Sequence, residues 1–276
     1  MCRLLAFASK ESTSIGALLT PNELTKYRDM STLHGDGWGA AVWESDAGIE
    51  KVNSVHRAID DPNFFTVASA PATAGIVHLR WATAGLPVCI ENTHPFTSGE
   101  WSFAHNGSFQ HPERLLDILS DDRRAALEGT TDSELYFQLI MQEAQRHGDI
   151  VSGVRSAVSI IRETCGLGSL NCLLLSPGRL LAVQAVATTP APVKSLQRAA
   201  GDEGLPEGHD ENYYHLRYTI RDGGFIVAST GVAVDGWTTQ LNDAIIDVAP
   251  ERGTASVWSL DTGVLQSTIA FAAPSS

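Results

Sequence analysis

The second residue of the chain is a cysteine, and apolar sequence follows it almost at once. Removal of Met1, which the small side chain of Cys2 permits, would leave a thiol and a free α-amine on one residue. An α-amine titrates near ~8, so part of it is neutral at cellular pH and can accept the thiol proton, directly or through a water. Cys2 is therefore a candidate nucleophile. The alternative is that Cys2 is an ordinary buried residue at the start of a first strand over residues 3–8.

Composition excludes several classes of function. The 276 residues are 43% hydrophobic and 18% charged, which predicts a soluble globular protein, and we expect a single domain over residues 1–276. The formal net charge of −13 repels polyanions, so neither nucleic acid nor an anionic membrane is an expected partner. No transmembrane run or signal peptide is evident, and we predict a cytoplasmic protein. The four cysteines form no Cys-x-x-Cys pair, and we expect no metal and no cofactor.

The apolar periodicity predicts an α+β fold. A capping box of Thr20 and Glu23, with Pro21 at the first helical position, predicts a helix to about residue 29. Further helices are expected over residues 61–70, 113–119, 121–127, 131–148 (with a second capping box, Thr131 to Glu134) and 150–164. Strands are expected over residues 75–82, 101–105, 171–175, 180–186, 213–220, 224–229, 244–248, 256–260 and 264–270. Residues 188–212, rich in Pro, Gly, Ala and acids, are expected to form a long surface loop.

Two polar stretches near predicted strands are candidates for a site. His34 to Gly39 contains three glycines, which indicates a tight turn or a close approach of another segment to the backbone. A metal site at His34 and Asp36 is not favoured, because no second ligand pair accompanies them. Arg80 is placed at the end of a core strand, where its guanidinium needs an anion. That anion is either a ligand carboxylate or a nearby Asp or Glu.

Two other positions allow both a structural and a chemical interpretation. Asn106-Gly107 follows a predicted strand and is a hairpin signal, but it also offers a side-chain and a backbone amide to an oxyanion. Asp132 is expected in the first turn of a helix, where the helix dipole alone favours a carboxylate.

The order of the motifs resembles a known family. The chain is similar to the class II glutamine amidotransferases, which are N-terminal nucleophile hydrolases, and most resembles their stand-alone, single-domain members, including the γ-glutamyl amidohydrolase of ergothioneine synthesis. This resemblance implies a four-layer αββα sandwich. It rests on Met1-Cys2, His34-Gly35-Asp36-Gly37-Trp38-Gly39, His78-Leu79-Arg80-Trp81-Ala82-Thr83, Asn92-Thr93-His94-Pro95-Phe96, His105-Asn106-Gly107 and Thr131-Asp132-Ser133-Glu134.

The resemblance also implies roles for individual residues. Cys2 would attack the side-chain amide of glutamine or of another γ-glutamyl compound, with its own α-amine as the base. The substrate would be held by its two charged groups, and the oxyanion by two amide donors. Catalytic roles fall on Cys2, Asn106 and Gly107, and substrate binding on Arg80 and Thr83 for the α-carboxylate, Asp132 for the α-ammonium, and Trp81 and His94 in the pocket.

One departure from the family pattern bears on the reaction. Ala84 stands where the aminosugar-forming members usually have a histidine, which argues against an aminosugar synthase. No acceptor domain is recognisable downstream, so released ammonia would need a partner enzyme, or the protein is a plain γ-glutamyl hydrolase. Tyr213, Tyr214, His215 and Arg217 are candidates for contacting the rest of the substrate, or else part of a strand with Leu216, Tyr218 and Ile220 facing the core.

Two other functions stay open at this point. The chain also resembles other N-terminal cysteine hydrolases, the bile-salt and penicillin amidases, whose acyl substrates lack an amino-acid end and would leave Arg80 and Asp132 without a purpose. A catalytically silent binding scaffold would instead keep Met1 in place.

Overall fold

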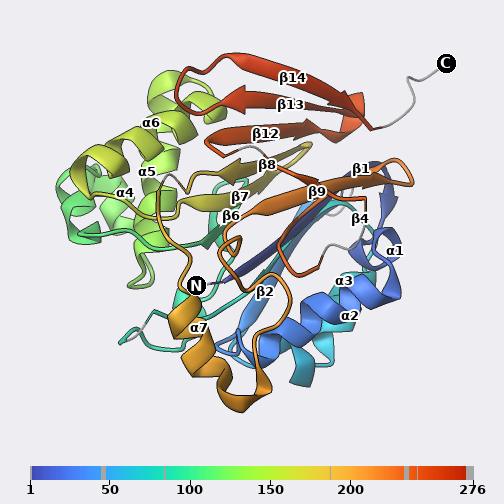
Figure 1. The fold of residues 1–276 in the computed structure, drawn as a ribbon. Coiled ribbons are helices and arrows are strands. Elements are labelled where there is room, and N and C mark those ends of the chain that lie inside the picture. The colour runs from blue at the N-terminus through green and yellow to red at the C-terminus, as the bar shows by residue number, and fades with distance from the viewer. Residues whose placement is uncertain are drawn as a thin grey trace.

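Two antiparallel sheets form the centre of the protein. The computed structural model describes residues 2–44, 48–83, 85–186, 188–232, 236–240 and 242–271. Within these residues the strands form two seven-stranded sheets, and helices cover the outer face of each sheet (Figure 1). The α+β class and the four-layer αββα sandwich are therefore confirmed. Met1 and Ala84, which carry two of the expectations above, lie outside the described residues.

The first sheet has the strand order β11-β9-β10-β1-β4-β2-β3, with its neighbouring strands antiparallel. Its strands are β1 (Arg3–Thr13), β2 (Trp38–Glu44), β3 (Gly48–Ser54), β4 (Ala72–Leu79), β9 (Leu216–Arg221), β10 (Gly224–Ser229) and β11 (Thr238–Thr239).

The second sheet has the order β14-β13-β12-β8-β7-β6-β5 and is also antiparallel. Its strands are β5 (Phe96–Ser98), β6 (Trp101–Asn106), β7 (Asn171–Ser176), β8 (Arg179–Gln184), β12 (Ala244–Ala249), β13 (Thr254–Ser259) and β14 (Leu265–Ala270).

The helices divide between the two outer layers. Helices α1 to α3 pack on the first sheet and α5 and α6 on the second, as the apolar clusters on each side record. The helices are α1 (Ile15–Leu18), α2 (Pro21–Asp29), α3 (Asn63–Ser69), α4 (Asp121–Ala125), α5 (Asp132–His147), α6 (Ile150–Thr164) and α7 (Val193–Ala200), and short 3₁₀ turns include η3 (Ile90–Asn92) and η4 (Pro112–Asp117). In the described part of the chain, no helix has the length and apolar character needed to cross a bilayer.

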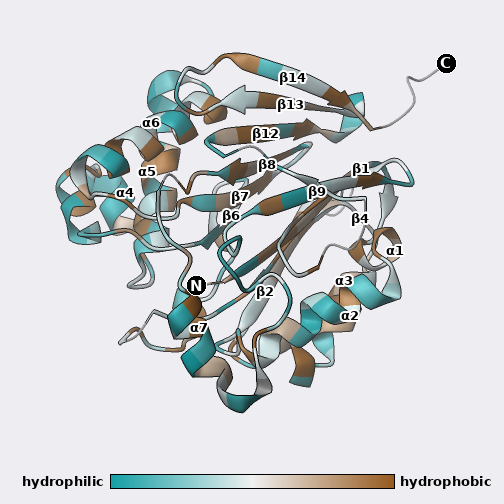
Figure 2. Ribbon diagram, viewed as in Figure 1, coloured by the Kyte–Doolittle hydropathy of each residue, from teal (hydrophilic) through white to brown (hydrophobic). Residues whose placement is uncertain are grey.

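The period of two along β1 explains the layering. Leu4, Ala6 and Ala8 face the second sheet, whereas Leu5 and Phe7 face the helices. Because successive side chains of a strand point to opposite faces, a strand buried on both faces must be apolar throughout. Figure 2 shows this as apolar strands in the middle of the sandwich and hydrophilic faces on α2 and α7.

The helix starts were predicted with mixed success. Thr20 and Glu23 form the expected capping box at α2, with Pro21 at its first position. Thr131 caps α5 by accepting from the Glu134 backbone at 3.2 Å. The predicted bond from the Thr131 backbone to the Glu134 side chain was wrong. The Glu134 carboxylate accepts instead from the backbone nitrogens of the preceding loop, at residues 128 and 129.

Other expectations need correction. Residues 188–212 are not a continuous loop, because they contain α7, which buries Leu196. Asn106-Gly107 is not a hairpin turn: β6 pairs with β5 and with β7, and β7 arrives only after α5 and α6. The predicted strand 75–82 ends at Leu79, so Arg80 lies just beyond it, and the strand predicted from residue 213 begins at Leu216.

Glu23 ties α2 to the far edge of the first sheet, and its removal should destabilise the protein. It is fully buried and accepts from Arg221 (2.9 Å to one nitrogen) and Trp237 (3.0 Å). We expect Glu23→Gln to lower the free energy of unfolding at pH 7 by about 2–3 kcal/mol, as for hydrogen bonds to a charged group. Chemical denaturation measures this, with Glu50→Gln on an exposed position of β3 as the control.

The same variant should change the pH dependence of stability. Burial raises the pKa of Glu23, but hydrogen bonds from Arg221, Thr20 and Trp237 lower it from 4.5 to about 2. A depressed folded-state pKa contributes stability that is complete above pH 4.5 and lost as the pH falls toward 2. Glu23→Gln should flatten the stability curve in that window, and an unchanged slope would contradict this account.

Candidate active site

The two sheets meet at Cys2. Its backbone nitrogen donates to Asn106 Oδ1 at 2.8 Å, although the residues are 104 positions apart. Cys2 directly precedes β1 of the first sheet, and Asn106 is the last residue of β6 in the second. The side chain of Cys2 is buried, with Sγ 3.8 Å from the backbone oxygen of Trp81.

Asn106 and Gly107 present amide donors beside the thiol. Because Asn106 Oδ1 accepts from Cys2, its Nδ2 is left, and this buried nitrogen has no partner among the described residues. A Cβ at Gly107 would lie 1.9 Å from the backbone oxygen of Ser169, so only glycine allows this approach. Ser169 Oγ also donates to the Asn106 backbone oxygen at 2.9 Å, which fixes the end of β6.

A narrow pocket opens over Cys2. It brings together seven of the eight residues that the sequence indicated, and the eighth, Asn106, contacts Cys2 directly. The pocket is lined by Cys2, Arg80, Trp81, Ala82, Thr83, Leu86, Asn92, His94, His105, Gly107, Thr131, Asp132 and Ser133.

Arg80 is a buried cation without a carboxylate partner. Its guanidinium donates to two backbone oxygens, of Asp36 at 3.3 Å and of Pro87 at 3.0 Å. In the described part of the chain it forms no ion pair, so the structural ion pair considered from the sequence is not found there. Arg80 also lines the pocket.

Asp132 supplies the opposite charge. It is in the first turn of α5, as predicted, and its oxygens accept from the Phe109 backbone at 3.4 Å and from Ser133 Oγ at 3.3 Å. No basic side chain pairs with it among the residues described. One pocket therefore contains a thiol, a cation and an anion, and neither charge has an ion-pair partner among the described residues.

The glycine-rich loop holds the strand end that carries Arg80. Asp36 Oδ2 accepts from the Ala82 nitrogen at 2.8 Å, and the Arg80 nitrogen donates to the Gly37 oxygen at 2.8 Å. A Cβ at Gly39 would lie 2.2 Å from the His94 backbone oxygen. Of the two alternatives for this loop, the close approach of another segment is confirmed.

Buried histidines surround the thiol, and sequence reasoning gave a role only to His94. His94 lines the pocket, and neither of its buried ring nitrogens has a partner in the described residues. Burial and the nearby charges of His78, His105 and Arg80 hold its pKa well below the usual 6.5, so the ring is neutral. His105 donates from Nε2 to the Ser169 oxygen at 2.9 Å, and its Nδ1 lies 2.9 Å from Ser133 Oγ.

A second buried cation, Arg3, is linked to Cys2 through Tyr213. Arg3 is fully buried, lies 3.8 Å from the centre of the Tyr213 ring and donates to the Tyr213 backbone oxygen at 2.9 Å. The Tyr213 hydroxyl donates to the Cys2 backbone oxygen at 3.1 Å. His209 Nε2 accepts from Arg3 Nε at 3.3 Å and lies 2.8 Å from His34 Nε2. Tyr213 therefore holds the nucleophile in place and does not line the pocket.

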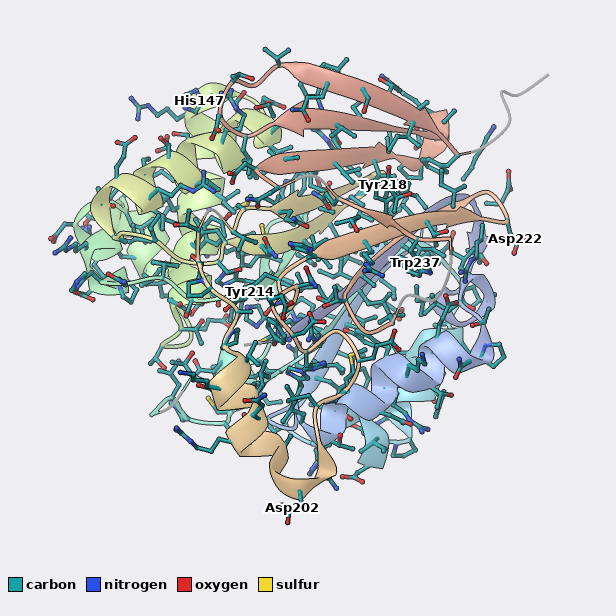
Figure 3. All side chains as sticks on the ribbon, in the orientation of Figure 1. His147, Asp202, Tyr214, Tyr218, Asp222 and Trp237 are labelled. Carbon is teal, nitrogen blue, oxygen red and sulfur yellow. The ribbon has the colours of Figure 1, made fainter. Side chains whose placement is uncertain are left out.

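The remaining candidates after the 188–212 segment lie elsewhere. Tyr214, labelled in Figure 3, and His215 line a separate cleft, and Arg217 is on β9. Tyr214 and Tyr213 pack in one cluster with Val186 and Leu196, against which Trp81 of the active-site pocket also packs. That separate cleft is lined by Val186, Thr188, Thr189, Glu211, Tyr214, His215 and Asn242.

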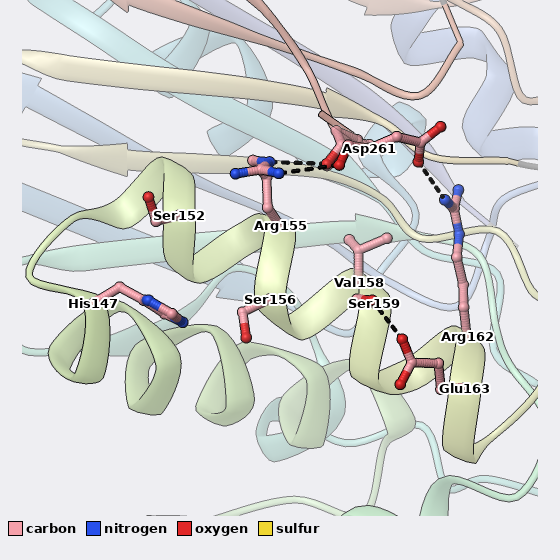
Figure 4. A pocket seen from close by; sticks show the side chains of 10 residues that line it. His147, Ser152, Arg155, Ser156, Val158, Ser159, Arg162, Glu163 and Asp261 are labelled. Atoms are coloured by element: carbon pink, nitrogen blue, oxygen red, sulfur yellow. Dashed lines mark hydrogen bonds and ion pairs between the residues drawn. The ribbon is translucent and has the colours of Figure 1, made fainter. Parts of the chain in front are cut away.

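A larger cleft on α6 is a poorer candidate for chemistry. Arg155 donates to the backbone oxygens of Leu260 and Asp261, and Arg162 pairs with Asp261 at 3.7 Å (Figure 4). The two arginines are thus held by backbone oxygens and by a carboxylate, and none of the residues given for its lining is a cysteine.

Comparison with known proteins identifies the family. A family model for the class-II glutamine amidotransferases matches residues 1–198. This chain belongs to that family. The glutamine--fructose-6-phosphate aminotransferase [isomerizing] of Idiomarina loihiensis is 31% identical over 159 residues, which are 57% of this chain and 25% of that protein. The chain thus matches about a quarter of the length of this relative.

Solved structures share the fold of this amidotransferase chain. A glutamine aminotransferase class-II domain protein from Silicibacter pomeroyi has a TM-score of 0.60 at 17% identity, covering 91% of this chain and 96% of that one. The allosteric regulatory enzyme of purine biosynthesis has a TM-score of 0.63 at 15% identity and covers 95% of this chain and 50% of its own. The fold therefore occurs both in chains of similar extent and as half of a longer protein.

The thiol of Cys2 should react at unusually low pH. Burial alone would raise its pKa, but the positive amino terminus and His78 have the larger opposite effect. Together they lower the pKa of Cys2 from 9.0 to about 6. Burial raises the pKa of Cys172 to about 12. We expect the rate of Cys2 alkylation by iodoacetamide to rise with a midpoint near pH 6, while Cys172 stays unmodified up to pH 9. Peptide mass spectrometry of one sample measures both, and a Cys2 midpoint above pH 8 would contradict the assignment.

Proposed function

We propose that this protein hydrolyses the side-chain amide of glutamine or of a γ-glutamyl compound, with Cys2 as its nucleophile. One observation carries the proposal. Arg80 and Asp132, which form no ion pair among the described residues, line the same pocket as the Cys2 thiol. A γ-glutamyl group ends in one carboxylate and one ammonium, and it needs one fixed cation and one fixed anion.

Binding is proposed to follow the charges. The substrate α-carboxylate accepts from the Arg80 guanidinium and from Thr83, and its α-ammonium donates to Asp132. Neutral His94, with both ring nitrogens unpartnered among the described residues, offers one donor and one acceptor to the bound amino acid. Trp81 borders Cys2 through its backbone oxygen. These contacts would leave the γ-amide carbon beside Sγ.

The proposed reaction has two stages. The Cys2 thiolate attacks the amide carbon, and Asn106 Nδ2 and the Gly107 nitrogen donate to the oxyanion, each worth about 3 kcal/mol in comparable enzymes. Once Met1 is removed, the Cys2 nitrogen is an α-amine that can carry the thiol proton to the leaving nitrogen. Water then hydrolyses the γ-glutamyl thioester and releases glutamate.

The leaving group has two proposed fates. With glutamine it is ammonia, which a partner enzyme could accept; with a γ-glutamyl compound it is an amine, as in the ergothioneine-pathway member that the sequence resembles. A panel of glutamine and γ-glutamyl amines, assayed for released glutamate, distinguishes them: the compound with the highest kcat/KM names the leaving group. A preference for glutamine that appears only with an added acceptor enzyme supports ammonia transfer.

Arg80→Gln should weaken hydrolysis through substrate binding. Losing a charge-assisted contact of about 2–3 kcal/mol should lower kcat/KM for γ-glutamyl substrates roughly 100-fold, mainly through KM. Arg57→Gln, at an exposed arginine paired with Asp60, is the control and should be unaffected. Glutamate release measures both variants. Undiminished γ-glutamyl hydrolysis by Cys2→Ala, or equal activity of the two arginine variants, would refute the proposed function.

A further inference from the structure

The register of the first sheet puts His78 on the same face as Cys2. Leu4 of β1 is paired with His78 of β4, and Arg3 with Leu79. Cys2 precedes Leu4 by two residues, so its side chain points to the same side of the sheet as Leu4. Diagonal neighbours across antiparallel strands are within reach of long side chains. His78, fully buried, therefore lies beside the candidate nucleophile.

The second sheet fixes the protonation of the His78 ring. His78 Nε2 lies 3.2 Å from the backbone oxygen of His105, and because a carbonyl only accepts, Nε2 carries the hydrogen. In the neutral ring Nδ1 is then a bare acceptor. This atom is buried and has no partner in the described part of the chain. The His94 ring packs against the imidazole, with centroids 4.3 Å apart, and limits its rotation.

Adjacent residues of β6 hold the histidine and the cysteine. His105 accepts from His78 through its backbone oxygen, and Asn106 accepts from the Cys2 nitrogen. The proximity of His78 is among the causes that lower the pKa of Cys2. The strand β6 therefore holds the His78 ring and the Cys2 thiol next to each other.

We propose that His78 is a second proton acceptor for Cys2, acting through Nδ1 alongside the α-amine. This inference rests on the proposed function of Cys2 as a nucleophile. The S–H bond breaks, the proton passes to Nδ1, and the sulfur electron pair forms the bond to the amide carbon. When the tetrahedral intermediate collapses, the C–N bond breaks and the proton on Nδ1 is returned to the leaving nitrogen, so His78 ends neutral.

The charged groups around His78 favour this role. The acidic groups near this cluster are Cys2 and Asp132, which acts on His105. Arg80 is cationic, and His94 and His105 are buried imidazoles whose pKa is lowered. A proton on Nδ1 is therefore stabilised chiefly by the thiolate that released it, and the ion pair forms and disappears within one turnover.

Two substitutions separate the base from the structural contact. His78→Gln can keep the amide donor to the His105 oxygen but has no base, and His78→Asn places an amide near the position of Nδ1. Both should move the midpoint of Cys2 alkylation up by about one pH unit or more. Both should also lower kcat/KM for glutamate release roughly 100-fold at pH 7, because a general base typically contributes 10²–10⁴-fold. His147→Gln, at an exposed histidine, is the control for loss of an imidazole.

The outcomes are distinguishable from failure of the proposed function. If no γ-glutamyl compound is hydrolysed but the alkylation midpoint moves in both variants, Cys2 and His78 are still coupled and only the substrate assignment fails. An unmoved midpoint in folded His78→Gln overturns the inference. Nitrogen NMR of the wild-type protein tests it should both variants fail to fold: a protonated Nε2 and a bare Nδ1 that shifts on alkylation of Cys2 are expected, and the opposite tautomer overturns it.

Discussion

The hydrogen bond from the Cys2 nitrogen to Asn106 Oδ1 is the contact on which the site depends. It joins the start of β1 in one sheet to the end of β6 in the other, so the separation of the two sheets is set where the thiol lies. Gly107 lets the chain pass against Ser169 immediately afterwards, and the Ser169 hydroxyl returns a hydrogen bond to the Asn106 backbone. Because the side-chain oxygen of Asn106 accepts from Cys2, its side-chain nitrogen has no partner among the described residues. A single side chain thereby positions Cys2 and, on the proposed function, provides an oxyanion donor.

Arg3 is the second constraint, and it explains why the last third of the chain matters to the first residues. A fully buried guanidinium is costly unless its donors are satisfied. Here the acceptors are the oxygens of Gly208 and Tyr213 and the ring of His209, and the Tyr213 ring covers its face. The contacts of Arg3 thus fix the segment before β9. In this segment the Tyr213 hydroxyl donates a hydrogen bond to the Cys2 backbone oxygen. The pocket itself lies within residues 1–198, matched by the family model, but its support comes from beyond them.

How far the sequence predicts this fold follows from which signals are local. The α2 capping box and the apolar periods of α5, α6 and the central strands are local, and these elements were predicted correctly. Strands β3 and β5 were missed, because β3 is largely polar and β5 has only three residues. Helix α7 was missed because it buries only Leu196. Asn106-Gly107 follows the hairpin rule in sequence, but tertiary pairing with β7 overrides it. For the site, the motif order indicated the pocket residues, whereas the contacts of Tyr213 and His78 depend on strand register and long-range packing.

The electrostatics of the pocket also bear on the competing functions. An acyl amide without an amino-acid end would give neither Arg80 nor Asp132 a partner, and leaving the buried Arg80 charge unpaired costs several kcal/mol. On the proposed function, a γ-glutamyl group would satisfy both charges at once, so the same residues would favour one class of substrate over the other. A silent scaffold does not explain a thiol whose pKa is lowered to about 6. Burial raises the pKa of a cysteine that only packs in the core, as it does for Cys172. On the proposed function, the buried Arg80 charge therefore favours a substrate that carries a carboxylate.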